Sequence, residues 1–137
     1  MTALVDTSAL VDTTALVDTS ILIDYLRGHR GAADLLEGER ASGVLPASEI
    51  TRLAVLAGMR PAEEEPRRSL LATLAWHDVD ARVAEEAGAL GRRWLPSHQG
   101  IDGADLAIAA TTILAGAELL TLNVRHFPMF PELRPPY

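Results

Sequence analysis

The sequence predicts an α/β sandwich with a mainly parallel sheet. Short, β-prone apolar segments alternate with longer segments whose apolar residues recur at helical spacing. Strands separated by helices are typical of parallel sheets, because a parallel pair needs a long crossover connection. The chain has 137 residues, which is enough for one domain with a real core and too few for two.

The first half of the chain alternates in this way from residue 16. Leu16 and Val17 form a short strand that ends at Asp18, and Ser48 is placed to cap a helix. The other elements expected here are a helix over residues 21–27 stopped by Gly28, a short helix over 31–37, a strand over 43–47, and a helix from Ser48 to about Gly58.

The second half continues the alternation after a polar turn at residues 61–66. Asp80 is placed to cap a helix that runs to about Leu95. The remaining expected elements are a helix over residues 67–75, a strand over 76–79, a loop over 96–100, a helix over 101–115, a strand over 118–121 and a surface tail over 127–137.

Composition limits the classes of function. The chain has no cysteine, which fits a reducing cytoplasm, and no apolar run approaches the roughly 20 residues that span a bilayer. No basic region precedes an apolar one at the N-terminus, so a signal peptide is not expected. The formal net charge of −7 argues against bulk attraction to nucleic acid. If the substrate is a nucleic acid, a metal ion or a partner must supply positive charge locally.

Four carboxylates stand at the ends of expected elements. Asp18 follows a strand, Glu49 begins a helix, and Asp102 and Asp105 share one face near the start of another helix. Each one alone is better explained by a helix cap or by the helix dipole than by a catalytic role. Because parallel strands end at a common edge of the sheet, the fold allows all four carboxylates to lie close together at that edge. Sites made only of carboxylates suit hard cations such as Mg²⁺ or Mn²⁺, which activate water on a phosphodiester.

Other catalytic chemistries find little support. The four histidines lack metal-ligand spacing, the segment at residues 100–103 lacks the Lys and Ser/Thr of a phosphate-binding loop, and no serine triad is indicated.

Four segments, in order, resemble the motifs of a known family. Residues 17–26 (VDTSILIDYL), 48–51 (SEIT), 105–111 (DLAIAAT) and 120–127 (LTLNVRHF) are similar to the four motifs of the PIN domain. Their order and spacing match the VapC-type toxins of bacterial toxin–antitoxin pairs, over about residues 15–133. One such motif alone is weak evidence for the family, whereas four motifs in the right order are strong evidence.

The resemblance implies a PIN-like three-layer sandwich and a Mg²⁺-dependent endoribonuclease, with Mn²⁺ as a possible substitute. Carried over, Asp18, Glu49 and Asp105 form the acidic metal site, and Asp102 adds a direct or water-bridged ligand. The family's fourth motif often has an aspartate before its phenylalanine, where this chain has His126. Asn123 is then expected to orient water or metal from the same strand end.

The resemblance also implies partners. These are a cognate VapB-type antitoxin, an RNA substrate and a second copy of the chain. The implied location is the cytoplasm, and no membrane is involved. Basic contacts to RNA would come from among Arg27, Arg30, Arg52, Arg92, Arg93 and Arg125. Two alternatives stay open: a PIN-like nuclease of RNA processing, and a catalytically inactive RNA-binding module, which the histidine at position 126 favours.

The hexapeptide ALVDTS is written three times over residues 3–20, with Thr in place of the last Ser in the second copy. Only the third copy precedes an amphipathic segment, so strand, aspartate and helix occur together only at Asp18. We therefore expect residues 1–14 to be a repeated extension and residues 15–137 to be the PIN domain. The simplest explanation of the extension is a tandem in-frame expansion of the hexapeptide, and a mis-set start codon is the alternative.

Overall fold

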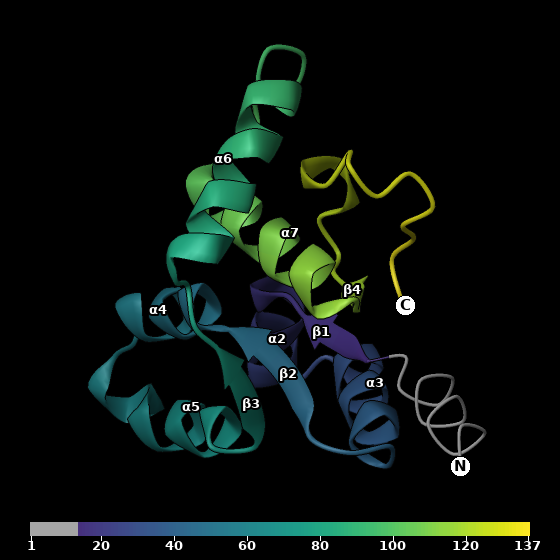
Figure 1. Cartoon of the computed structure of the whole chain (residues 1–137). Coiled ribbons are helices and arrows are strands. Elements are labelled where there is room, and N and C mark those ends of the chain that lie inside the picture. Colours follow the sequence, from purple (N-terminus) through teal and green to yellow (C-terminus); the bar gives the residue numbers. More distant parts are fainter. Residues whose placement is uncertain (1–13) are drawn as a thin grey trace, which may run out of the picture.

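The computed structural model describes residues 14–137, and Figure 1 shows its arrangement. The described residues form six α-helices, four short strands and two 3₁₀ turns. In chain order these elements are β1 (Ala15–Val17), α2 (Thr19–Leu26), α3 (Arg30–Arg40), β2 (Leu45–Ser48), α4 (Glu49–Ala57), η1 (Pro61–Glu63), α5 (Glu64–Leu71), β3 (Leu74–His77), α6 (Ala81–Trp94), α7 (Gly103–Ala115), β4 (Glu118–Leu120) and η2 (Val124–His126).

All the strand pairs are parallel, as predicted. β1 pairs with β4, with Val17 opposite Leu120, and β2 pairs with β3, with Leu45 opposite Leu74. The predicted single sheet is divided into these two ladders, which meet where β1 lies beside β2. The strands therefore lie in the spatial order β4, β1, β2, β3, and the α/β class is confirmed.

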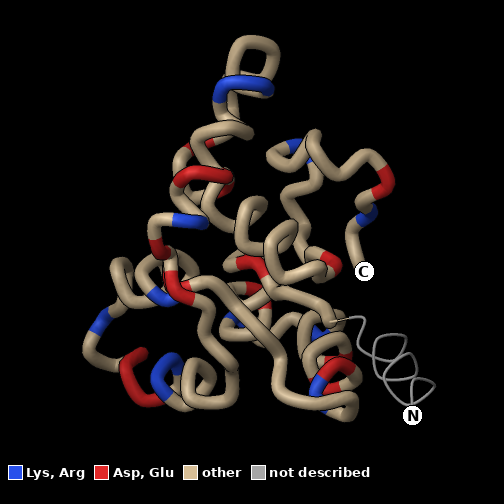
Figure 2. The backbone as a smooth tube through the Cα atoms, in the orientation of Figure 1, with Lys and Arg blue, Asp and Glu red and all other residues tan. Residues whose placement is uncertain are grey.

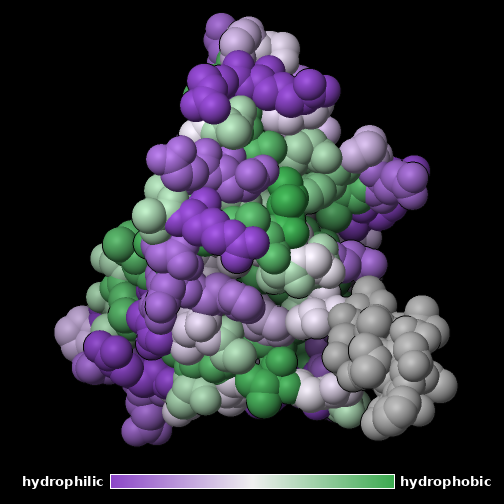
Figure 3. Space-filling view, viewed as in Figure 1, coloured by the Kyte–Doolittle hydropathy of each residue, from purple (hydrophilic) through white to green (hydrophobic). Residues whose placement is uncertain are grey.

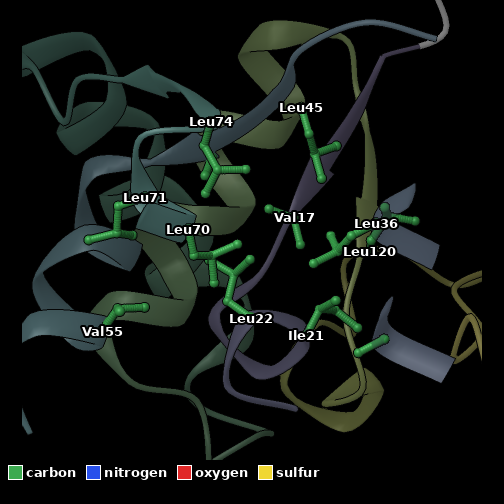
Figure 4. Packing of buried hydrophobic residues seen from close by; sticks show 12 residues of the cluster. Val17, Ile21, Leu22, Leu36, Leu45, Val55, Leu70, Leu71, Leu74 and Leu120 are labelled. Carbon is green, nitrogen blue, oxygen red and sulfur yellow. The ribbon is translucent and has the colours of Figure 1, made fainter. Parts of the chain in front are cut away.

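Alternate residues of β1 and β4 face two separate cores, as the twofold period of a strand requires. Val17 and Leu120 pack in one core with residues of α2 to α5, several of which are labelled in Figure 4. Leu16 and Leu119 pack in the other core with residues of α6 and α7. Helices thus cover both faces of the central strands, which makes the three-layer sandwich that was expected.

The third hexapeptide supplies β1 and the residue after it. The Asp18 backbone N–H donates to the Leu120 carbonyl at 2.9 Å, so the ladder with β4 runs to the end of the strand. α2 starts at the next residue, two residues earlier than predicted. The first two copies lie outside the described residues except for Thr14, so the expected extension over residues 1–14 stays a prediction.

The structure corrects the prediction for residues 61–79. The predicted polar turn is a 3₁₀ turn followed by the first residues of α5, and α5 ends at Leu71 rather than at residue 75. The Thr73 hydroxyl donates to the Leu70 carbonyl at 2.7 Å and closes this end. β3 then begins at Leu74, two residues before the predicted strand. An apolar run of this length does not distinguish helix from strand, and pairing with β2 decides its structure.

The other predicted elements are present with shifted ends. α3 covers residues 30–40 rather than 31–37, and β2 covers 45–48 rather than 43–47. Ser48 and Asp80 cap α4 and α6 as expected, accepting from Ile50 N and Val83 N. α7 begins two residues later than predicted because Asp102 is its N-cap. It ends at Ala115 as predicted, and Gly116 follows with a φ of 64°, which suits a residue without a side chain.

In the described part of the chain, no helix combines the length and the apolar character needed to cross a membrane. Figure 3 shows hydrophilic side chains over much of one face, with smaller apolar patches between them.

Candidate active site

Asp18 is a buried carboxylate held by hydroxyl groups from two segments. Its Oδ2 accepts hydrogen bonds from Thr121 Oγ1 at 2.6 Å and from Ser20 Oγ at 3.0 Å, and the residue is 4% exposed. Both hydroxyls also accept from backbone N–H groups, of Asn123 and Leu122 respectively. The orientation of each hydroxyl is therefore fixed, and Oδ1 takes no part in these two bonds.

Asp105 is the second buried carboxylate, and it comes from the first turn of α7. Asp102 Oδ1 accepts from the Asp105 backbone N–H at 2.8 Å, while Asp105 Oδ2 accepts from the Asp102 N–H at 3.1 Å. This reciprocal capping box fixes the start of α7. His126 Nδ1 lies 3.2 Å from Asp105 Oδ2, so the histidine at the family's fourth motif contacts an acid of the third.

Burial raises the pKa of Asp105 to about 6, and the nearby charge of Asp102 acts in the same direction. The hydrogen bond from the Asp102 backbone and the charge of His126 oppose this rise. A carboxylate that is costly to ionise in a cleft is a candidate functional group, because a bound cation would offset the cost of its charge.

This shift predicts a pH-dependent stability of the metal-free protein. The pKa of Asp105 rises from 3.8 to about 6 on folding, so the folded state binds the proton more tightly and the free energy of unfolding falls as pH rises through this range. Asp105→Asn is expected to be more stable than the wild type by about 2 kcal/mol near neutral pH, with the difference lost near pH ~4. Urea unfolding in EDTA measures this, and Asp34→Asn on α3 controls for the loss of one acid. An equal difference at both pH values would contradict the assignment.

A cleft of about 380 Å³ brings Asp18 and Asp105 together with Asn123. These three predicted site residues come from the end of β1, the start of α7 and the loop after β4. Asp102 does not line the cleft and is connected to it only by its hydrogen bonds with Asp105. The other lining residues are Thr19, Ser20, Ile23, Asp24, Arg27, Ala104, Ile108 and Leu122.

Glu49 makes different contacts and does not line this cleft. Its carboxylate accepts two hydrogen bonds from Arg52, at 2.6 and 3.1 Å, which hold the pKa of Glu49 below its ordinary value against the effect of burial. The Arg52 guanidinium also lies 4.2 Å from the centre of the Trp76 ring. The structure therefore does not bring Glu49 into the cleft with Asp18 and Asp105, and its carboxylate is paired with Arg52.

Residues 15–131 match the family model described as the PIN domain. The chain belongs to the PIN-domain family. The curated relatives include Ribonuclease VapC19 of Mycobacterium tuberculosis, which is 46% identical over 83% of this chain and 92% of its own length. Ribonuclease VapC10 of the same species is 40% identical over 82% of this chain and 85% of its own length. A toxin–antitoxin complex from Klebsiella pneumoniae is a solved structural relative, with a TM-score of 0.76 and 32% identity over 90% of this chain and 98% of that one.

Sequence reasoning missed one residue that supports this PIN domain's cleft from behind Asp18 and one residue that lines it. Thr121 makes the shortest bond to Asp18, although the two residues are 103 positions apart. A polar residue directly after a buried strand was the available signal. Asp24, which lies in the first family motif, lines the cleft from α2 and was given no role. The Ser20 hydroxyl donates to Asp18, and the Thr19 hydroxyl donates to the Thr51 hydroxyl.

PIN-domain nucleases of the VapC kind are generally metal-dependent. Within residues 14–137, no three His, Asp or Glu side chains are grouped so as to hold a metal ion. The cleft still fits a hard cation, because its oxygen donors include the carboxylates of Asp18 and Asp105 and the amide of Asn123. Mg²⁺ is commonly bound by one or two carboxylates and keeps several waters. The two carboxylates of this cleft are therefore enough protein ligands of the right type for Mg²⁺.

Proposed function

We propose that this protein is the toxin of a type II toxin–antitoxin pair and that it is a Mg²⁺-dependent endoribonuclease, with Mn²⁺ able to substitute. The proposal rests on one observation above all: Asp18 and Asp105 line a single cleft in a PIN domain. The curated relatives named Ribonuclease VapC19 and VapC10 support the reaction and its RNA substrate.

We assign Asp18 and Asp105 as the residues that hold the cation, with Asn123 contributing an amide oxygen or orienting a water. A bound Mg²⁺ would lower the pKa of a water and offset charge on the phosphate. Thr121 and Ser20 donate to one oxygen of Asp18, which fixes the orientation of its carboxylate. Asp102 holds the first turn of α7 and so positions Asp105. Glu49 and Asp102 are kept as further candidate ligands.

The carboxylates of Asp18 and Asp105 make the cleft of this PIN domain negative, so a cation is expected to bind there before RNA does. Without an ion, two carboxylates repel the phosphodiester backbone. Strict metal dependence is therefore expected on electrostatic grounds. His126, next to Asp105, is placed to reduce the local negative charge when it is protonated.

We further propose that a VapB-type antitoxin neutralises this protein and that the toxin forms a homodimer. The Klebsiella pneumoniae relative is a toxin–antitoxin complex, which supports the antitoxin. An enzyme that cuts cellular RNA would act in the cytoplasm. Co-purification of a small partner from the native operon tests the toxin assignment against a nuclease of RNA processing.

The activity is tested with purified protein and total RNA in Mg²⁺, in Mn²⁺ and in excess EDTA. Cleavage is expected with either metal and should disappear in EDTA, because the cation provides the activated water. Cleavage that persists in EDTA would contradict the metal-dependent mechanism. RNA binding without cleavage in any metal would instead favour the inactive binding module.

A further inference from the structure

Arg27 lies on the wall between two hollows of the surface. It lines the acidic cleft together with Asp18 and Asp105, and it also lines a neighbouring hollow of about 270 Å³. That second hollow contains Arg60 and Arg67, with Glu63 as its one acid. A basic surface therefore adjoins the candidate active site in a chain whose net charge is −7. Figure 2 shows basic positions beside acidic ones in the region of η1 and α5.

Two of these arginines have no acidic partner among the described residues. The ion pairs of residues 14–137 involve Arg52, Arg67, Arg68 and His126, and none involves Arg27 or Arg60. Arg67 also donates to the Val55 carbonyl at 2.7 Å, which gives it a structural role. The guanidinium groups of Arg27 and Arg60 are the ones available to a ligand.

The natural partner of Arg27 is bonded elsewhere. Asp24 stands three residues before Arg27 on α2, a spacing that favours an ion pair. Its Oδ2 instead accepts a hydrogen bond from the Tyr137 hydroxyl at 2.9 Å. Tyr137 thus occupies one oxygen of this carboxylate, and Asp24 makes no ion pair with Arg27.

The Tyr137 ring reaches Asp24 by packing against His29 and Gly31. Its ring lies 4.9 Å from the ring of His29, and a Cβ atom at Gly31 would lie 2.8 Å from its Cδ1. The absence of a side chain at Gly31 therefore lets the ring approach. Burial and the bond to Asp24 raise the pKa of Tyr137, so its hydroxyl keeps the proton that it donates.

We propose that Arg27 and Arg60 form a binding subsite for a backbone phosphate of the RNA next to the scissile bond, and that Tyr137 is a positioning residue which keeps Arg27 available by holding Asp24. The inference rests on the proposed ribonuclease function and extends it. Guanidinium groups bind phosphate oxygens in a bidentate manner, and each contact releases counterions. Arginine would bind one backbone phosphate at the subsite, and the bound cation would neutralise the next phosphate in the acidic cleft.

The subsite predicts a defect in substrate binding rather than in the chemical step. Arg60→Gln and Arg27→Gln are each expected to raise KM for RNA cleavage about three- to tenfold at low salt, with kcat little changed for Arg60→Gln. The slope of log kcat/KM against log salt should become shallower by about 0.7 per arginine. Arg68→Gln is the matched control, because Arg68 pairs with Glu64 and lines neither hollow.

The positioning role of Tyr137 is tested by a double-mutant cycle. Tyr137→Phe keeps the ring and removes only the hydroxyl, so Asp24 becomes free to pair with Arg27 and KM should rise about threefold. In the Asp24→Asn background the same change should have no further effect. Equal rises in KM in both backgrounds would show that the hydroxyl acts independently of Asp24, and no rise in either would show that only the ring matters; each result would overturn the positioning role.

The outcomes separate the two proposals. If the wild type cleaves no RNA in any metal, the proposed function fails, and the subsite fails with it. If it cleaves and Arg60→Gln matches Arg68→Gln in KM and salt slope, the subsite alone is wrong. An Arg60→Gln protein with unchanged KM but weaker inhibition by the antitoxin would assign this surface to a protein partner and would also overturn the subsite.

Discussion

Asp18→Asn is expected to reduce metal-dependent RNA cleavage at least about 100-fold, because substitutions merely adjacent to a metal ligand already cost 10- to 100-fold. Asparagine keeps an oxygen that accepts from Thr121 and Ser20, so the fold at this position should persist while the charge proposed to hold the cation is lost. Initial rates of RNA cleavage in Mg²⁺ and Mn²⁺ measure the loss, and urea unfolding checks that the variant is folded.

The repeated hexapeptide supplies a matched control for this experiment. Asp6→Asn makes the same change in an identical copy of ALVDTS, and we expect it to cleave like the wild type. Loss of cleavage in Asp6→Asn with activity retained in Asp18→Asn would show that an earlier copy occupies the strand. Equal activity in all three proteins would remove Asp18 from the site.

Phe127→Ala is expected to lower the free energy of unfolding by about 3–5 kcal/mol, since it deletes a large side chain and leaves a cavity. Phe127 is 1% exposed and is among the largest fully buried side chains of the described residues. It packs in the core of α6 and α7, directly after the turn that carries His126. Its removal should also loosen the contact between His126 and Asp105. Urea denaturation at neutral pH gives the loss.

Leu53→Ala is the comparison for this measurement. Leu53 is 62% exposed on α4, so its truncation should change the stability by no more than about 0.5 kcal/mol. Phe127→Leu should recover part of the loss, because it refills some of the cavity. Similar losses for Phe127→Ala and Leu53→Ala would contradict the burial of Phe127.

The sequence predicted those parts of the site that are local in the chain. Leu16, Val17 and Asp18 identify a strand that ends in an acid, and the structure has β1 and the cleft there. The spacing of Asp102 and Asp105 places both at the start of one helix, where they form a capping box. The pair Glu49 and Arg52 was equally local, at three residues apart in α4, and its ion pair was overlooked.

Contacts between distant segments decided the rest. Thr121 reaches Asp18, Tyr137 reaches Asp24, and His126 reaches Asp105 only after the chain has folded back across the sheet. The end of α5 was likewise decided by the pairing of β3 with β2 rather than by the pattern of its own residues.

The sequence by itself thus determined the family motifs, the α/β alternation and the register of the third hexapeptide, because helical period, strand period and capping act over a few residues. Only the tertiary structure decided which acids share a cleft and which are held by another residue. That choice depends on where β1, α7 and the segment after β4 meet. Burial and hydrogen bonding at that meeting point, rather than spacing along the chain, distinguish Asp18 and Asp105 from Glu49.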